Sequence, residues 1–141
     1  MSLELTIFVG LPGSGKSTYY LAHLATTHAQ ISKDLMPNAK RRDANQSLAV
    51  EKALAAGQSV VVDNTNPSRA IRAPLIAIGK RHGARIIAYY FECSVRTALM
   101  RNRQREGPGR VPDVAIFVTR KKLAAPTLDE GFDEVRVIQC E

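Results

Sequence analysis

A glycine-rich segment near the start of the sequence contains the residues best suited to chemistry. Residues 10–17 match the pattern GxxxxGK[ST] at every fixed position. Such glycines let backbone N–H groups surround phosphate oxygens, and a helix that follows presents its positive end to the anion. We expect Lys16 to contact the outer phosphates of ATP and the Ser17 hydroxyl to bind Mg²⁺. The predicted ATP contacts in this loop are Gly10, Pro12, Gly13, Ser14, Gly15, Lys16, Ser17 and Thr18.

The segments on either side of these glycines support a phosphate-binding loop. The apolar residues 5–9 predict a strand before the loop, and a helix-like segment begins at Lys16. Glycine, serine and proline could instead form an ordinary turn between a strand and a helix. Because the full pattern occurs in its expected context, we favour the phosphate-binding loop.

A carboxylate is expected near the loop, since Mg²⁺ in such sites usually needs an acidic ligand, directly or through water. Asp63 ends the apolar run 59–62, at the edge where ligands of open α/β sheets bind. We therefore predict that Ser17 and Asp63 hold the metal. Residues 63–67 also suit a turn with a helix cap, and both interpretations can be true.

Asp34 follows a second short apolar stretch and should face the same loop. A carboxylate near the γ-phosphate could accept the proton of an attacking hydroxyl, as kinases require. A turn aspartate is the competing interpretation, and the spacing does not separate the two.

Two arginines lie further along the chain. Arg101 and Arg105 are four residues apart, which places them on one flank of a predicted helix. Arginines beside a mobile loop can bind phosphates while charge moves during transfer. Residues 107–109, with the sequence Gly-Pro-Gly, form a candidate lid in this basic neighbourhood. A solvated, charged helix flank is the alternative.

Short apolar runs alternate with helix-like segments along the whole chain. This pattern predicts an α/β fold in one domain over residues 1–141, with about five mostly parallel strands and helices on both faces. Together with the phosphate-binding loop and the candidate lid, it leads us to expect a three-layer P-loop NTPase/kinase-like fold with a short helical lid. Pro74 predicts a kink or break in the third helix. The predicted strands are 5–9, one ending near 31, 59–62, 84–91 and 134–138, and the predicted helices are 16–25, 43–56, 67–82, 95–105 and 112–123.

Composition limits the class of protein. The chain has 141 residues, 45% hydrophobic and 23% charged, which indicates a globular domain. It contains no apolar run near the roughly 18 residues of a membrane span, and its first residues do not resemble a secretory signal, so we expect a cytoplasmic protein without membrane contact. The net charge of +7 suits a nucleic acid or another phosphate-rich ligand.

The cysteines and histidines lack the spacing of metal ligands. We expect Cys93 and Cys140 to be free, reduced thiols. We expect His23, His28 and His82 to lie at the surface or at helix ends.

Five segments taken together resemble the kinase domain of the polynucleotide 5′-hydroxyl kinase family. These segments are residues 10–18, 31–34, 61–67, 101–105 and 111–112, in this order. The resemblance implies a P-loop kinase that moves the γ-phosphate of ATP to a 5′-hydroxyl of DNA or RNA. It implies that Lys16, Asp34 and Arg105 are catalytic, with Asp34 as the general base, that Arg101 and Arg105 bind the donor phosphates, and that Asp63 supports the acceptor or the metal shell. The residues that we expect at the acceptor are Asp34, Asp63, Asn64, Asn66 and Arg41.

The sequence departs from the family on the acceptor side. Family members usually carry an arginine shortly after the base, which binds the acceptor's phosphate, but here residues 35–38 are Leu-Met-Pro-Asn. Lys40, Arg41 and Arg42 could take over that task, and a solvated basic loop is equally consistent. A small-molecule hydroxyl acceptor, such as a sugar acid, a nucleoside or an antibiotic, is therefore the alternative. An ATP-gated binding module is a third hypothesis.

Overall fold

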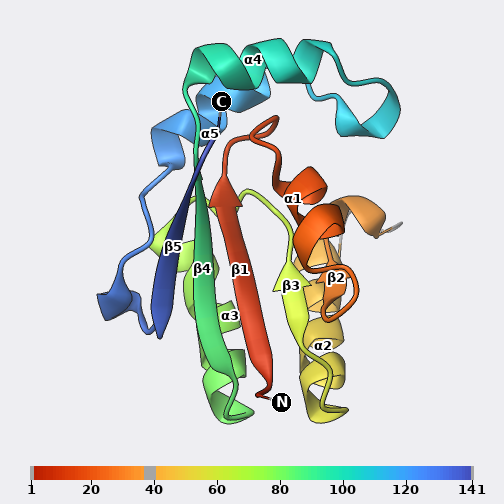
Figure 1. Ribbon diagram of the computed structural model, residues 1–141, viewed down its shortest axis with the longest axis vertical. Coiled ribbons are helices and arrows are strands. Elements are labelled where there is room, and N and C mark those ends of the chain that lie inside the picture. The colour runs from red at the N-terminus through yellow and green to blue at the C-terminus, as the bar shows by residue number, and fades with distance from the viewer. Residues whose placement is uncertain (1, 37–40, 141) are drawn as a thin grey trace.

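The computed structural model describes residues 2–36 and 41–140. A parallel sheet with strand order β2-β3-β1-β4-β5 forms its centre (Figure 1). The strands are β1 (Glu4–Gly10), β2 (Ala29–Ile31), β3 (Val60–Val62), β4 (Arg85–Glu92) and β5 (Glu134–Gln139). The helices are α1 (Lys16–His23), α2 (Arg42–Ala55), α3 (Arg69–Arg81), α4 (Val95–Arg103) and α5 (Asp113–Lys122), with short 3₁₀ helices η1 (Lys33–Leu35), η3 (Gly107–Gly109) and η4 (Leu128–Glu130).

The central strand β1 is buried on both faces, because its alternate side chains enter two different apolar clusters. Leu5, Ile7 and Val9 pack with residues of α2 and α3. Phe8, on the opposite face, packs with Tyr20 of α1. Helices therefore cover both faces of the sheet, and the predicted three-layer α/β fold is confirmed.

Helices α4 and α5 lie beyond the carboxyl end of the sheet (Figure 1). They pack on each other and on the loop that follows β1, through a cluster that contains Leu11, Ala98 and Ile116. Strand order changes direction at β1, so this loop lies where open α/β sheets bind their ligands.

Helix α3 differs from its prediction at two points. It begins at Arg69, because Ser68 caps it by accepting a hydrogen bond from the N–H of Ile71. It then continues through Pro74 to Arg81, so a break of the helix near Pro74 is wrong, while a kink there stays a prediction. The carbonyl that loses its usual donor belongs to Ala70, an exposed residue.

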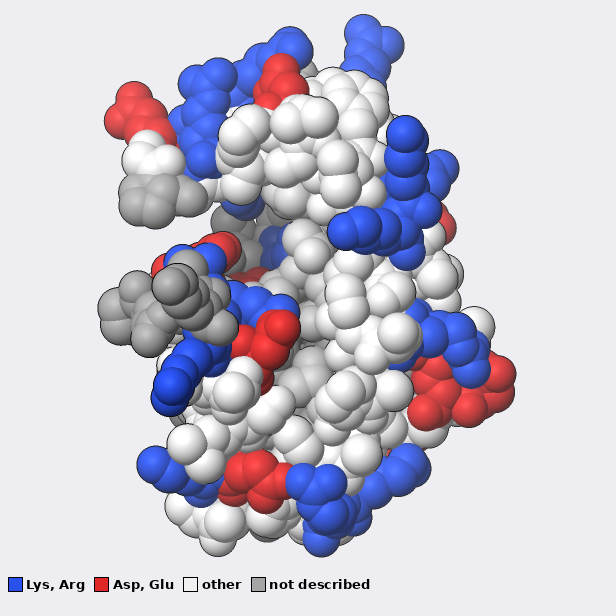
Figure 2. Space-filling view, turned by 180° about the vertical axis from the view of Figure 1, so that it is seen from behind, with Lys and Arg blue, Asp and Glu red and all other residues white. Residues whose placement is uncertain are grey.

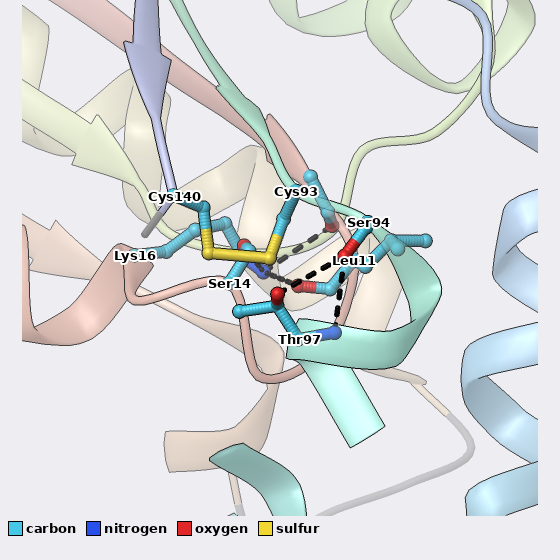
Figure 3. The surroundings of a disulfide bond; sticks show 8 residues. Leu11, Ser14, Lys16, Cys93, Ser94, Thr97 and Cys140 are labelled. Atoms are coloured by element: carbon cyan, nitrogen blue, oxygen red, sulfur yellow. Dashed lines mark hydrogen bonds between the residues drawn. A yellow bond between two sulfur atoms is a disulfide. The ribbon is translucent and has the colours of Figure 1, made fainter. Parts of the chain in front are cut away.

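The prediction of free thiols is also wrong. Cys93 and Cys140 follow the neighbouring strands β4 and β5 and form a disulfide, with Cα atoms 4.8 Å apart (Figure 3). The parallel register pairs Glu92 with Gln139, so the next residue on each strand lies at the same level. A separation of 47 residues in the chain gave no sign of this proximity.

His28 is buried, contrary to its predicted surface position. Its ring nitrogens contact the Thr27 hydroxyl at 2.7 Å and the Glu4 carboxylate at 2.8 Å. His82 lies at the end of α3, as predicted, and contacts Glu51.

None of the helices within residues 2–36 and 41–140 combines the length and apolar character that crossing a bilayer requires.

Candidate active site

The glycine-rich loop joins β1 to α1 and has little room for side chains. Gly13 and Gly15 adopt positive φ angles of +81° and +90°, which favour glycine. A Cβ atom on Gly13 would lie 2.6 Å from the carbonyl oxygen of Ala98, and one on Gly15 would lie 2.8 Å from Nη1 of Arg101. Helix α4 therefore lies directly over the loop, and Arg101 reaches it.

Lys16 turns its ammonium group back into the loop. Nζ donates to the carbonyl oxygen of Leu11 at 2.7 Å and to that of Gly10 at 3.2 Å. Burial lowers the pKa of Lys16 to about 8, although the nearby Asp63 carboxylate works in the opposite direction. An anion bound in the loop would restore the preference for the charged form.

The side chains of Ser17, in α1, and Asp63, directly after β3, are in contact, as a shared role in holding Mg²⁺ would require. The Ser17 hydroxyl donates to Oδ2 of Asp63 at 2.8 Å, and Gln30 donates to the same oxygen at 2.8 Å. Asp63 is buried at the end of β3. The described residues contain no group of three or more His, Cys, Asp or Glu that could enclose a metal. The pair nevertheless offers the hard oxygen atoms that Mg²⁺ prefers when phosphates supply its other ligands.

Asn64 and Asn66 hold the segments of the site together. Asn66 is buried, and its amide donates to the carbonyl oxygen of Phe8 at 2.7 Å. Asn64 accepts a hydrogen bond from the backbone N–H of Lys33 at 2.9 Å and donates to Gln46 of α2. Asn64 thereby fixes η1, the segment that carries Asp34.

A cavity of about 400 Å³ brings the predicted catalytic groups together. Asp34 enters it from η1, and Arg105 enters it from the connection between α4 and α5. Figure 2 shows a cleft with charged side chains at this level, below the part of the molecule formed by α4 and α5. The lining includes Pro12, Lys16, Ser17, Asp34, Asp63, Asn64, Asn66 and Arg105.

The two lid arginines occupy different positions. Because α4 ends at Arg103, Arg105 lies beyond the helix, and the predicted shared helix flank is wrong. Arg105 lines the cavity and donates to the carbonyl oxygen of Gly109 in η3, at 3.2 Å.

The basic residues after Asp34 also separate. Arg41 is exposed at the start of α2, whereas Arg42 lines the cavity. Lys40 lies outside the described residues.

Sequence reasoning missed several residues of the cavity wall. Lys33 lines it beside Asp34, Ile71 lines it from α3, and Thr119 and Lys122 line it from α5. The spacing of three between Thr119 and Lys122 places them on one side of a helix. This spacing could be recognised in the sequence, but the sequence alone did not show which side of the helix faces the cavity.

The parallel sheet, the loop and the buried lysine define a P-loop nucleotide-binding domain. A protein family described as an AAA domain matches residues 5–126, and the chain belongs to this family. A bifunctional polynucleotide phosphatase/kinase of Schizosaccharomyces pombe is 29% identical over 139 residues, which cover 96% of this chain and 33% of that protein. This relative supports the resemblance to polynucleotide kinases. The chain spans about a third of the length of this relative and of a second curated relative that it matches.

Solved structures share the fold at lower identity. A gluconokinase from Sinorhizobium meliloti 1021 has a TM-score of 0.70 and 19% identity, covering 97% of this chain and 82% of that one. A fungal RNA kinase has a TM-score of 0.62 and 17% identity, covering 100% of this chain and 77% of that one. The fold is therefore that of P-loop kinases with different acceptors.

Proposed function

We propose that the protein is a kinase that transfers the γ-phosphoryl group of ATP to a 5′-hydroxyl of DNA or RNA. The observation that supports this proposal is that Asp34, Lys16 and the Ser17–Asp63 pair all line one cavity, where Asp34 would act as the base and Lys16 would bind phosphate. A module that only binds nucleotide has no need of a base at this position. The name of the Schizosaccharomyces pombe relative supports a polynucleotide acceptor.

The donor side acts by binding and orientation. Backbone N–H groups of the loop and the ammonium of Lys16 bind the phosphates of ATP. Ser17 and Asp63 would hold Mg²⁺, which neutralises phosphate charge when bound. Arg101, above Gly15, and Arg105, in the cavity, contribute positive charge where negative charge moves during transfer.

The acceptor side supplies the proton transfer. Asp34 accepts the proton of the attacking hydroxyl, whose oxygen forms a bond to the γ-phosphorus. The bond from that phosphorus to the bridging oxygen breaks in line, and ADP leaves with the electron pair.

The test is transfer of γ-labelled phosphate from Mg·ATP to 5′-hydroxyl oligonucleotides of DNA and of RNA. We expect Lys16→Ala and Asp34→Asn to reduce labelling by at least about a hundredfold, and Asp34→Asn to keep its affinity for ATP. Lys52→Ala changes an exposed residue of α2 and should label normally.

The same assay decides between a polynucleotide and a small-molecule acceptor. Failure of the wild-type protein to label any oligonucleotide, with labelling of gluconate or another small hydroxyl compound, would replace the polynucleotide by a small acceptor. Binding of ATP without transfer to either class would favour a nucleotide-gated module.

A further inference from the structure

A second cavity, of about 330 Å³, adjoins the first. We call it the α2–α3 groove, because α2 and α3 form its sides. Lys33 and Ile71 line both cavities, so the groove lies next to the site that contains Asp34. The other lining residues of the groove are Asp43, Gln46, Ser47, Ala70, Pro74 and Leu75.

Arg42 and Lys33 bring positive charge to the wall of the first cavity. Arg42 lines the first cavity from the start of α2, and its Nε atom is buried without a hydrogen-bond partner among the residues that the structure describes. Leaving such a donor unsatisfied is costly, and an anionic oxygen would satisfy it. Lys33, which lines both cavities, is a second cation, and Asp43 balances its charge in an ion pair of 2.5 Å. The unsatisfied Nε of Arg42 is therefore the group that best suits a phosphate oxygen.

The walls of the groove suit a nucleobase or sugar rather than a second anion. Ile71, Pro74 and Leu75 offer apolar surface, while Gln46 and Ser47 offer polar groups that can bind the edge of a base. The volume lies within the range of small-ligand sites. An acceptor that ended in the first cavity would leave this surface unused.

We propose that a polynucleotide acceptor extends from the first cavity into the α2–α3 groove. Its 5′-hydroxyl lies at Asp34, the following phosphate contacts Arg42 and Lys33, and the second nucleotide occupies the groove. This inference rests on the proposed function and adds to it a direction for the strand. A strand that left past Thr119 and Lys122 on α5 would not enter the groove.

The test compares three acceptors under the same labelling conditions: a nucleoside, a nucleoside 3′-monophosphate and a dinucleotide with a 5′-hydroxyl. Arg42→Ala should reduce kcat/KM about tenfold to a hundredfold for both phosphate-bearing acceptors and leave the nucleoside unchanged. Ala70→Trp fills the groove at an exposed position that does not line the first cavity. It should reduce kcat/KM for the dinucleotide about tenfold and leave the 3′-monophosphate within about twofold.

Ala77→Trp is the matched control, since it places the same side chain at an exposed position two turns along α3. The proposal that the second nucleotide binds in the groove would be overturned if both tryptophan variants changed kcat/KM for the dinucleotide equally. It would also be overturned if Ala70→Trp lowered kcat/KM equally for the 3′-monophosphate and the dinucleotide. Binding of a fluorescent 5′-hydroxyl dinucleotide, with a non-hydrolysable ATP analogue present, separates the two proposals. If Ala70→Trp but not Ala77→Trp weakened binding of the dinucleotide, and the wild type transferred no phosphate, the groove would be supported as a binding site and the kinase function would be rejected. If the wild type transferred phosphate to the dinucleotide and neither tryptophan variant changed the rate, the kinase function would be supported and the groove would be rejected as its binding site.

Discussion

We expect Lys16 to couple the binding of ATP to the uptake of a proton. Its pKa of about 8 without ligand lies below the value of about 10.4 expected for an unfolded chain. The unfolded chain therefore binds more protons between these values, and this residue's contribution to stability rises as pH rises through that window. Bound phosphates favour the ammonium form, so ATP should take up a proton as it binds.

We expect an uptake of about half a proton per ATP at pH 8, and affinity that weakens as pH rises above 8. Titration calorimetry in two buffers with different ionisation enthalpies measures this uptake directly. Lys16→Met removes the titrating group and should abolish it. Heats that do not depend on the buffer in the wild type would contradict the assignment.

Arg72 is the most deeply buried charge outside the loop, and it connects three segments near the site. It is 0% exposed, and it donates to both carboxylate oxygens of Glu130 at 2.9 Å and to the backbone carbonyls of Asn66 and Ala124 at 3.0 Å. Burial acts to raise the pKa of Glu130, but hydrogen bonds from Arg72 and the Thr127 backbone leave it below its usual value.

Arg72→Met should lower the free energy of unfolding by about 3–5 kcal/mol, because it leaves Glu130 buried and charged without its partner. Urea denaturation measures the change. The double variant Arg72→Met with Glu130→Met removes both charges and should recover part of the loss. Equal stability of the single variant and the wild type would show that the pair contributes little.

At the level of elements, the features that could be predicted from the sequence are those that depend on a local pattern of residues. The strands were identifiable because they are short apolar runs buried on both faces, and the loop because glycine and lysine positions are fixed by phosphate geometry. The missed features depend on packing between distant segments. The end of α4 before Arg105 and the approach of Cys93 to Cys140 follow from how the lid and the last strand dock, which no local pattern encodes.

The disulfide joins the ends of β4 and β5 and closes a loop that contains α4 and α5. A link between residues 47 apart restricts the unfolded chain, and loop entropy sets an upper estimate of about 4 kcal/mol for its stabilisation. Cys140→Ser should therefore lower Tm, and a reductant should lower Tm of the wild type to a similar value. Thermal denaturation with and without dithiothreitol tests both. A wild type that does not respond to the reductant would argue against the bond.

On the scale of the whole molecule, contact with a polynucleotide should depend mainly on charge. The net charge is +7, and there is no tryptophan. Tyr20 and Tyr89 are buried, and Tyr19 packs against the rings of Phe8 and Tyr89, so these rings are not available to stack on bases. Lysines and arginines gather around the cleft and over the part of the molecule formed by α4 and α5 (Figure 2).

The affinity for a 5′-hydroxyl oligonucleotide should therefore fall steeply with salt. Two phosphate contacts, those proposed for Lys33 and Arg42, predict a slope of about −1.4 in a plot of log affinity against log salt concentration, or a loss of about sevenfold between 50 and 200 mM. Arg42→Ala should make this slope shallower by about 0.7, because one phosphate contact is lost, whereas Lys52→Ala should leave it unchanged. Fluorescence anisotropy at several salt concentrations gives both slopes. An affinity independent of salt would mean that the acceptor is held by something other than its phosphates, and would favour a small, uncharged hydroxyl compound in the same cavity.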